Sequence, residues 1–336
     1  MIDVALLKEQ PELIRSALAN RGVDLSAELA EIARLEAERR RMLPEIEGLK
    51  RDQNAAGEEV GRAKREGRDV SAIQEASKTR AQTIKQLSAE LDAIEEQRAK
   101  SMLVIPNVPH TSVPVGKSAA ENLEVRRVGQ PAAMSFTPQA HWDLGPALGI
   151  IDFERGTKIA GSRFYILRGQ AAALQRALIA WMLDVHREQG YDEVYVPFVV
   201  KEEMLVGTGQ LPKFADTMYH DAEEDLWLVP TAEVPVTNMY RDEIMEAATL
   251  PVRHAAYTPC FRHEQFSAGR DVRGIKRGFQ FDKVEMVQFV PEEDSWDALE
   301  QIVQDALDII RPLGLRYRVL RLATADLTFS SAMTYD

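Results

Sequence analysis

Charged and aromatic side chains alternate in two stretches of the chain, at Arg262 and Glu264 and again from Arg277 to Glu285. Arg262 and Glu264 follow an expected strand two residues apart, so they point to the same face. After a loop, a second expected strand brings five alternating residues to one face: Arg277, Phe279, Phe281, Lys283 and Glu285. The segment therefore predicts a hairpin that presents cations, aromatic rings and acids to one space.

Such a hairpin suits a nucleoside triphosphate. Arginine binds phosphate oxygens in a fixed fork geometry. An aromatic ring stacks on a base, and a carboxylate accepts a hydrogen bond from an exocyclic amine. The alternative is a salt-bridged hairpin whose aromatic rings lie in the core. Polar residues at successive inward positions count against that alternative, because a buried charge without a partner is costly.

Two long helices are predicted ahead of this hairpin, within about residues 26–100. The stretch is rich in strong helix formers, and its apolar residues recur at spacings of three and four. Gly67 suits a helix end, and Ser71 with Gln74 indicates a capping box for the next helix. We therefore expect an antiparallel coiled coil that forms an arm of roughly 60 Å. Pro44 predicts a kink or a break in the first helix.

The rest of the chain indicates an α+β fold. Residues 1–24 read as short helices, with Pro11 in a first turn, and prolines and glycines from about residue 105 mark entry loops. Helices are expected at 171–189 and 296–313, and strands at 193–200, 226–229, 255–257, 278–290 and 317–323. Because strands follow one another without alternating helices, we expect a largely antiparallel sheet with flanking helices.

Composition narrows the class of protein. The 336 residues are 45% hydrophobic, which is typical of a globular protein. Cys260 is the single cysteine, which excludes an internal disulfide and a CxxC metal site. No run of about 18 apolar residues appears, and charges begin at Asp3, so neither a membrane span nor a secretory leader is expected. We expect a cytoplasmic protein.

The net charge of −12 argues against a broad nucleic-acid-binding surface, since phosphate contacts need a basic field. Any RNA contact must use a local patch. The tip of the arm carries five cations, offset by neighbouring acids: Arg51, Arg62, Lys64, Arg65 and Arg68. They form either a solvated helix surface or a phosphate-contacting face.

The string FRHEQFSAGRDVRGIKRGFQFDKVE at 261–285 resembles the second signature motif of class II aminoacyl-tRNA synthetases in its seryl form. Segments that agree in order and spacing are 104–116, 141–167, 193–200, 207–214 and 230–238. The preceding helical arm agrees too, so the resemblance covers the whole chain. It implies a serine–tRNA ligase that forms seryl-adenylate from serine and ATP and transfers the seryl group to tRNA(Ser).

The resemblance implies a serine site made of Thr231, Ala232, Glu233, Arg262 and Glu285. Glu233 would pair with the substrate ammonium, and Glu285 would accept from its hydroxyl or amine. Arg262 would lie beside the α-phosphate and the substrate carboxylate.

An ATP site follows from the same motif: Arg262, His263, Glu264, Arg277 and Phe281. Glu264 would read the adenine amine, Phe281 would stack on adenine, and Arg277 would approach the outer phosphates. Arg262 and Arg277 would carry catalysis. His263 is expected to contribute its backbone more than its ring. Mg²⁺ is expected to arrive with ATP, and no resident metal is expected.

The resemblance also implies partners and domains. An N-terminal domain, 1–104, would grip tRNA(Ser), and a catalytic domain, 105–336, would dimerise around Pro197. In the homodimer the arm would serve the partner subunit's site. A carrier-protein ligase of the same family is disfavoured, because such proteins resemble the catalytic domain without the long arm.

Several positions depart from the family pattern: His263, Phe279, Ala325 and Met333. They affect fine substrate geometry more than the fold. The family continues beyond the residue that matches Asp336 with a further strand and a third motif. The alternative to an active ligase is therefore a truncated, catalytically impaired tRNA-binding protein.

Overall fold

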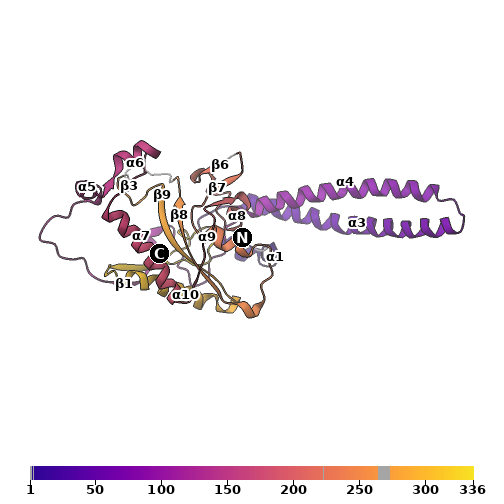
Figure 1. Ribbon diagram of the computed structural model, residues 1–336. Coiled ribbons are helices and arrows are strands. Elements are labelled where there is room, and N and C mark those ends of the chain that lie inside the picture. Colours follow the sequence, from indigo (N-terminus) through magenta and orange to yellow (C-terminus); the bar gives the residue numbers. More distant parts are fainter. Residues whose placement is uncertain (1, 3, 222, 264–272) are drawn as a thin grey trace. The chain divides into compact units, whose positions relative to one another are not determined.

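The structure is a computed structural model that describes residue 2 and residues 4–221, 223–263 and 273–336 (Figure 1). It divides into two compact units. Unit 1 comprises residues 1–121 and 323–333, and unit 2 comprises residues 122–322 and 334–336. The domain boundary that we expect at residues 104/105 stays a prediction.

Unit 1 begins with two short helices, α1 (Val4–Glu9) and α2 (Pro11–Asn20). Pro11 opens α2, where its missing N–H costs no hydrogen bond. Ile14 and Leu18 are buried on one face of α2 and pack against Ile32, Met102 and Ile105. This cluster joins the short helices to the base of the arm.

The predicted arm is present as α3 (Ser26–Arg65) and α4 (Ser71–Met102), which lie side by side in Figure 1. Met42 and Ile46 of α3 pack against Leu91 of α4. Two ion pairs, Arg39–Glu95 at 2.9 Å and Arg98–Glu36 at 2.8 Å, also cross between the helices. The arm is therefore held by a narrow apolar seam and by charges beside it.

The break at Pro44 and the capping box at Ser71 need correction. The helix α3 continues through Pro44, with the apolar seam on both sides of the proline, whereas the expected kink stays a prediction. The capping box at Ser71 is wrong because Ser71 is already the first residue of α4. Its backbone N and Oγ both donate to Asp69 Oδ1, at 2.9 and 2.7 Å. Gly67 does take the expected positive φ, +70°.

Arg21 connects the start of unit 1 to its late segment, residues 323–333. The side chain is only 8% exposed. Its guanidinium donates to the carbonyl oxygens of Asn107 (2.8 Å), Thr328 (3.2 Å) and Ser331 (2.6 Å). Burial lowers the pKa of Arg21 to about 10, so the group stays charged at neutral pH. Nothing in the sequence pattern predicted this role.

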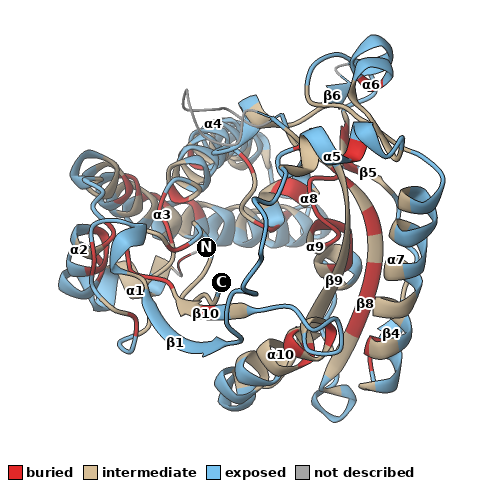
Figure 2. Ribbon diagram, turned by 90° about the vertical axis from the view of Figure 1, so that its left-hand side faces the viewer, coloured by how far each residue is buried: buried red, intermediate tan, exposed pale blue. Residues whose placement is uncertain are grey.

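Unit 2 is built around a long antiparallel hairpin of β8 (Val252–Phe261) and β9 (Gln280–Phe289). The strand β4 (Asp192–Glu193) pairs in parallel with β8, so β8 is central and largely buried (Figure 2). The helix α7 (Gln170–Glu188) lies along this sheet. The described strands thus pair mostly antiparallel beside helices, and the α+β class is confirmed.

Smaller elements complete unit 2. The remaining strand pairs are β1 (Leu123–Val128) with β10 (Tyr317–Arg321), β2 (Ile151–Asp152) with β3 (Ile166–Leu167), and β7 (Leu226–Leu228) with both β5 (Val199–Lys201) and β6 (His220–Asp221). The other helices are α5 (His141–Ala147), α6 (Phe153–Ala160), α8 (Glu202–Gly207), α9 (Glu233–Thr237) and α10 (Ser295–Ile310). Within the described ranges, no helix is both long and apolar enough to span a membrane.

Three strand predictions differ from the structure. The strand expected at 193–200 is two short strands, because β4 pairs with β8 whereas β5 pairs with β7. The strand β1 falls where entry loops were expected. The strand β9 begins at Gln280, so the predicted alternation does not extend back to Arg277 and Phe279.

Candidate active site

The register of β8 and β9 separates two faces of the hairpin. Phe281, Lys283 and Glu285 alternate along β9 and lie opposite Cys260, Thr258 and Ala256 of β8. Those three β8 residues are fully buried. Directly paired residues share a face of the sheet, so the charged side chains of β9 lie beside small, buried residues of β8.

An acid and a hydroxyl meet on this face. Thr231 Oγ1 donates to Glu285 Oε2 at 2.8 Å, and the backbone N–H of Glu233 donates to Thr231 Oγ1 at 3.2 Å. Lys283 Nζ forms an ion pair with the same oxygen of Glu285. Thr231 is buried, and so is the adjacent Ala232, just before α9. We call Thr231, Glu233, Arg262, Lys283 and Glu285 the charge cluster.

Arg262 reaches the charge cluster from the end of β8. Its Nε donates to the carbonyl oxygen of Pro230 at 3.1 Å, and its guanidinium carbon lies 5.2 Å from the centre of the Phe281 ring. The backbone N–H of Arg262 donates to Phe279 O at 2.9 Å. Arg262 is therefore held against both the segment that carries Thr231 and the aromatic ring on β9.

The charges in the cluster act on one another. Burial raises the pKa of the Glu233 carboxyl, and the charge of Glu285 raises it further. Lys283 and Arg262 lower the pKa of the same group. Two carboxylates and two cations thus share one partly buried space, where opposite charges favour ionised acids and like charges oppose them.

His263 and Arg277 lie in the segments just outside β8 and β9. The backbone N–H of His263 donates to Thr217 O at 2.7 Å, while its imidazole packs 4.8 Å from the Phe279 ring. Phe279 also meets Phe164 edge-on at 6.0 Å, so it packs with aromatic residues before β9 starts. Arg277 lies in the turn that precedes β9. Glu264 lies outside the described residues.

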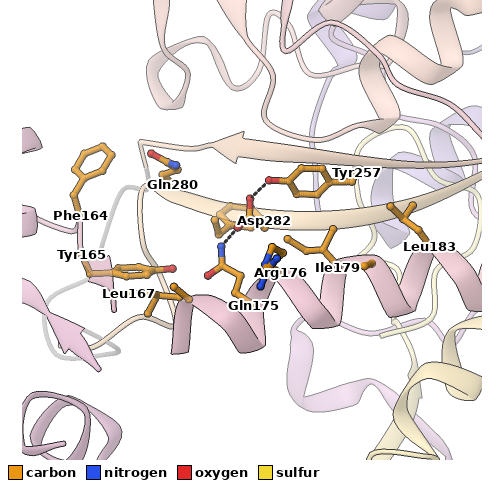
Figure 3. A pocket seen from close by; sticks show the side chains of 13 residues that line it. Phe164, Tyr165, Leu167, Gln175, Arg176, Ile179, Leu183, Tyr257, Gln280 and Asp282 are labelled. Atoms are coloured by element: carbon orange, nitrogen blue, oxygen red, sulfur yellow. Dashed lines mark hydrogen bonds between the residues drawn. The ribbon is translucent and has the colours of Figure 1, made fainter. Parts of the chain in front are cut away.

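The opposite face of the hairpin carries a separate cavity of about 590 Å³ against α7 (Figure 3). Asp282 points into it, where it accepts hydrogen bonds from Tyr257 Oη at 2.7 Å and from the Gln175 amide. Of the described candidate residues, only Phe281 also borders this cavity. The hydrogen bond from Gln175 to Asp282 therefore connects α7 to β9, whereas the neighbouring Lys283 faces the charge cluster.

Histidines outside the motif have structural partners. His254 Nε2 lies 2.7 Å from Tyr240 Oη, His186 Nδ1 lies 2.8 Å from Gln189 Oε1, and the His220 ring stacks on Trp227 at 4.0 Å. Among the residues that the structure describes, no three His, Cys, Asp or Glu side chains gather as metal ligands.

Comparisons with known proteins agree with the layout of the chain. Residues 1–109 match the Seryl-tRNA synthetase N-terminal domain, and residues 214–336 match the tRNA synthetase class II core domain (G, H, P, S and T). A serine–tRNA ligase of Roseiflexus sp. (strain RS-1) is 52% identical over 336 residues, which is all of this chain and 79% of that protein. The chain belongs to the seryl-tRNA synthetase family. The resemblance of its motifs to that family is confirmed.

Other members of the family agree. A serine–tRNA ligase of Chloroflexus aurantiacus (strain J-10-fl) is 49% identical over the whole of this chain and 79% of its own length. The solved seryl-tRNA synthetase from Pyrococcus horikoshii, complexed with ATP, matches with a TM-score of 0.90 and 33% identity. That match covers 100% of this chain and 80% of the other. The α+β architecture of the chain is thus shared with a solved member of the family.

Sequence reasoning missed one member of the charge cluster. Alternation along the expected strand puts Lys283 on the correct face, but the sequence alone gives it no role in the site. Its position two residues before Glu285 on one strand was the signal that could have revealed the ion pair.

Proposed function

We propose that the chain is a serine–tRNA ligase, which activates L-serine with ATP and transfers the seryl group to tRNA(Ser). The observation that carries this proposal is the charge cluster, in which Thr231, Glu285 and Arg262 meet although they come from three separate segments. The relatives that match the full chain at about half identity bear the name serine–tRNA ligase. They favour the ligase over an impaired tRNA-binding protein.

Serine recognition requires groups for an ammonium, a hydroxyl and a carboxylate. We assign the ammonium to Glu233 and the hydroxyl or amine to Glu285, which Thr231 orients. We assign the substrate carboxylate to Arg262. Ala232 is fully buried next to them and limits the space. A hydroxyl bound by polar groups gives selection that an alanine substrate cannot satisfy, because those groups would remain unpaired.

ATP recognition uses the aromatic side of the same face. We assign adenine stacking to Phe281, with Arg262 beside it for the α-phosphate. Arg277 and Glu264 are assigned to the outer phosphates and the adenine amine, and His263 to a backbone contact. Mg²⁺, bound through the phosphates of ATP, would offset their charge.

The reaction then needs positioning more than a protein nucleophile. The serine carboxylate attacks the α-phosphorus of ATP in line, the bond to pyrophosphate breaks, and seryl-adenylate forms. Arg262 neutralises charge on the α-phosphoryl group as it develops, and Arg277 does so on the leaving group. The terminal ribose hydroxyl of tRNA(Ser) next displaces AMP from the adenylate.

The arm and the dimer belong to the same proposal. The α3–α4 arm would grip tRNA(Ser). Its tip is not uniformly basic, because Arg62 and Arg68 both form ion pairs with Glu59. Dimerisation around Pro197 is supported by an exposed apolar stripe of Tyr195, Pro197 and Val199. A cytoplasmic location is part of the proposal.

Serine-dependent exchange of pyrophosphate into ATP, measured beside tRNA(Ser) binding, tests the function. We expect both activities in the wild type. We expect Arg262→Ala to abolish exchange and to leave tRNA(Ser) binding largely intact. Arg311→Ala, at the exposed end of α10, is the matched control and should leave both unchanged.

Two outcomes would contradict the proposal. Binding of tRNA(Ser) without exchange in the wild type points to the impaired tRNA-binding protein. Equal loss of exchange and tRNA binding in Arg262→Ala contradicts the separation of arm and active site.

A further inference from the structure

Lys283 lies at the centre of the charge cluster but takes no part in the reaction as proposed. It stands between Phe281 and Glu285 on β9, on the face away from α7. Its side chain is 32% exposed, and it forms an ion pair with Glu285, which is 21% exposed. A partly covered lysine loses some of its hydration, and contact with an acid offsets that loss.

Lys283 and Thr231 bind the same oxygen of Glu285. The Thr231 hydroxyl donates to Oε2 at 2.8 Å, and Lys283 Nζ contacts that atom too. The Thr231 oxygen is itself oriented by the backbone N–H of Glu233 at 3.2 Å. Two donors from different elements therefore fix one rotamer of the Glu285 carboxylate.

Charged and titratable groups from three elements lie near Glu233 and Glu285. Glu233 approaches from α9, Cys260 and Arg262 from β8 and its end, and Lys283 from β9 itself. Arg262 is committed to Pro230 O and the Phe281 ring, whereas Lys283 has a direct ion pair with an acid of the cluster. Burial and Glu285 raise the pKa of Glu233, and Lys283 and Arg262 oppose that rise.

We propose that Lys283 is a positioning residue of the serine site, which holds the Glu285 carboxylate in place and offsets the repulsion between Glu233 and Glu285 before the substrate ammonium arrives. This inference rests on the proposed function for the identity of the ligand. A cation beside two acids offsets their mutual repulsion, and the incoming ammonium then meets acceptors that are already oriented.

Removal of Lys283 has a defined consequence for pH. Without its charge the two carboxylates repel each other, so the pKa of Glu233 rises further and the acid binds a proton at higher pH. A protonated acid binds an ammonium poorly. Serine affinity, which is lost as pH falls through this pKa, is therefore lost at higher pH in the variant. We expect the pH at which serine affinity is half lost to rise by about one unit, within the range caused by one nearby charge.

Isothermal calorimetry of serine binding across mildly acidic to neutral pH tests the proposal. We expect Lys283→Met to weaken serine binding about tenfold on the acidic limb, the effect of one pKa unit. ATP affinity should not change. Lys283→Arg should recover most of the affinity, since it restores the charge. Lys201→Met, an exposed lysine on β5, should behave as the wild type.

Two results would overturn the proposal. A loss of ATP affinity as large as that of serine would make Lys283 a nucleotide contact. A loss of serine affinity that is the same at every pH would remove its effect on ionisation. Far-ultraviolet circular dichroism of each variant checks that the fold is kept.

A measurement without substrate separates this inference from the proposed function. Carbon-13 labelling of glutamate carboxyls lets nuclear magnetic resonance follow the titration of Glu233, assigned with Glu233→Gln. We expect its pKa to rise in Lys283→Met and to return in Lys283→Arg. A wild type that does not bind serine refutes the proposed function, whereas an unchanged Glu233 titration refutes the role of Lys283.

Discussion

At the scale of single residues, the Thr231 hydroxyl is both a donor and an acceptor of hydrogen bonds. It accepts from the backbone N–H of Glu233 and donates to Glu285. A hydroxyl has one proton, so these two bonds fix its orientation. The carboxylate that it holds is oriented before any ligand is present, which reduces the ordering that serine must impose on the site.

Thr231→Val keeps the shape of this side chain and removes its hydrogen bonds. A hydrogen bond to a charged group contributes about 1.5–3 kcal/mol, so kcat/KM for serine should fall about 10- to 100-fold. KM for ATP should change little. Pyrophosphate exchange at varied serine and ATP measures both. Thr249→Val, whose hydroxyl bonds to Glu246 O outside the cluster, is the control, and equal loss in both variants would contradict this role.

Arg21 gives a prediction for the stability of unit 1. Arg21→Met leaves partly buried carbonyl oxygens of Asn107, Thr328 and Ser331 without their donor. We expect the free energy of unfolding of unit 1 to fall by about 3 kcal/mol, measured in urea by circular dichroism. Arg15→Met on the same helix removes only an exposed ion pair with Glu12 and should cost less than about 1 kcal/mol. Similar urea midpoints for the two variants would contradict this role of Arg21.

Alternation along the sequence predicted part of the candidate site. The period of two on β9 placed Phe281, Lys283 and Glu285 on one face, because that period is set by the backbone alone. It failed for Arg277 and Phe279, because no sequence signal marked Gln280 as the start of the strand. The contact between Thr231 and Glu285 joins residues 54 positions apart, so only the family resemblance could anticipate it.

At the scale of elements, the arm was the most predictable part. Helix formers and a three-and-four spacing continue over α3 and α4, and local sequence decides such helices. The helix ends were harder to predict, because Asp69 rather than Ser71 supplies the hydrogen-bond acceptor at the start of α4. The division of 193–200 into β4 and β5 depends on partners distant in sequence, which local patterns do not contain.

Pro44 gives a prediction for the arm. It has no N–H to donate to Arg40 O, and its ring crowds the preceding turn, yet α3 continues past it. Pro44→Ala should therefore stabilise the helix locally by about 1–3 kcal/mol. Hydrogen exchange of the amides around residue 44 should slow about tenfold or more. Pro11→Ala, at the first position of α2, is the control without such a gain, and unchanged exchange near residue 44 would show that the proline is fully accommodated.

At the scale of the whole molecule, the exposed stripe beside β5 gives a test of the proposed dimer. Tyr195 is 85% exposed, which is unusual for a large aromatic residue beside exposed Pro197 and Val199. Tyr195→Asp should place a charge in the dimer interface and raise the dimer dissociation constant at least about tenfold, measured by sedimentation equilibrium.

Ile244→Asp provides the comparison, because Ile244 is 99% exposed and lies outside the stripe. It should leave the dissociation constant unchanged. A monomeric wild type, or equal effects of the two aspartates, would exclude the stripe as the interface.

The hydrogen bonds of Arg21 with Thr328 and Ser331 also have a consequence for folding during synthesis. Arg21 and its acceptor Ser331 are 310 residues apart, and a ribosome adding roughly 5–20 residues per second separates their synthesis by roughly 15–60 s. During that interval the second helix has left the ribosome with a cation that has yet to meet most of its acceptors. Closure of unit 1 therefore has to wait until Thr328 and Ser331 have been made, and a chaperone that shields α2 can act throughout that interval.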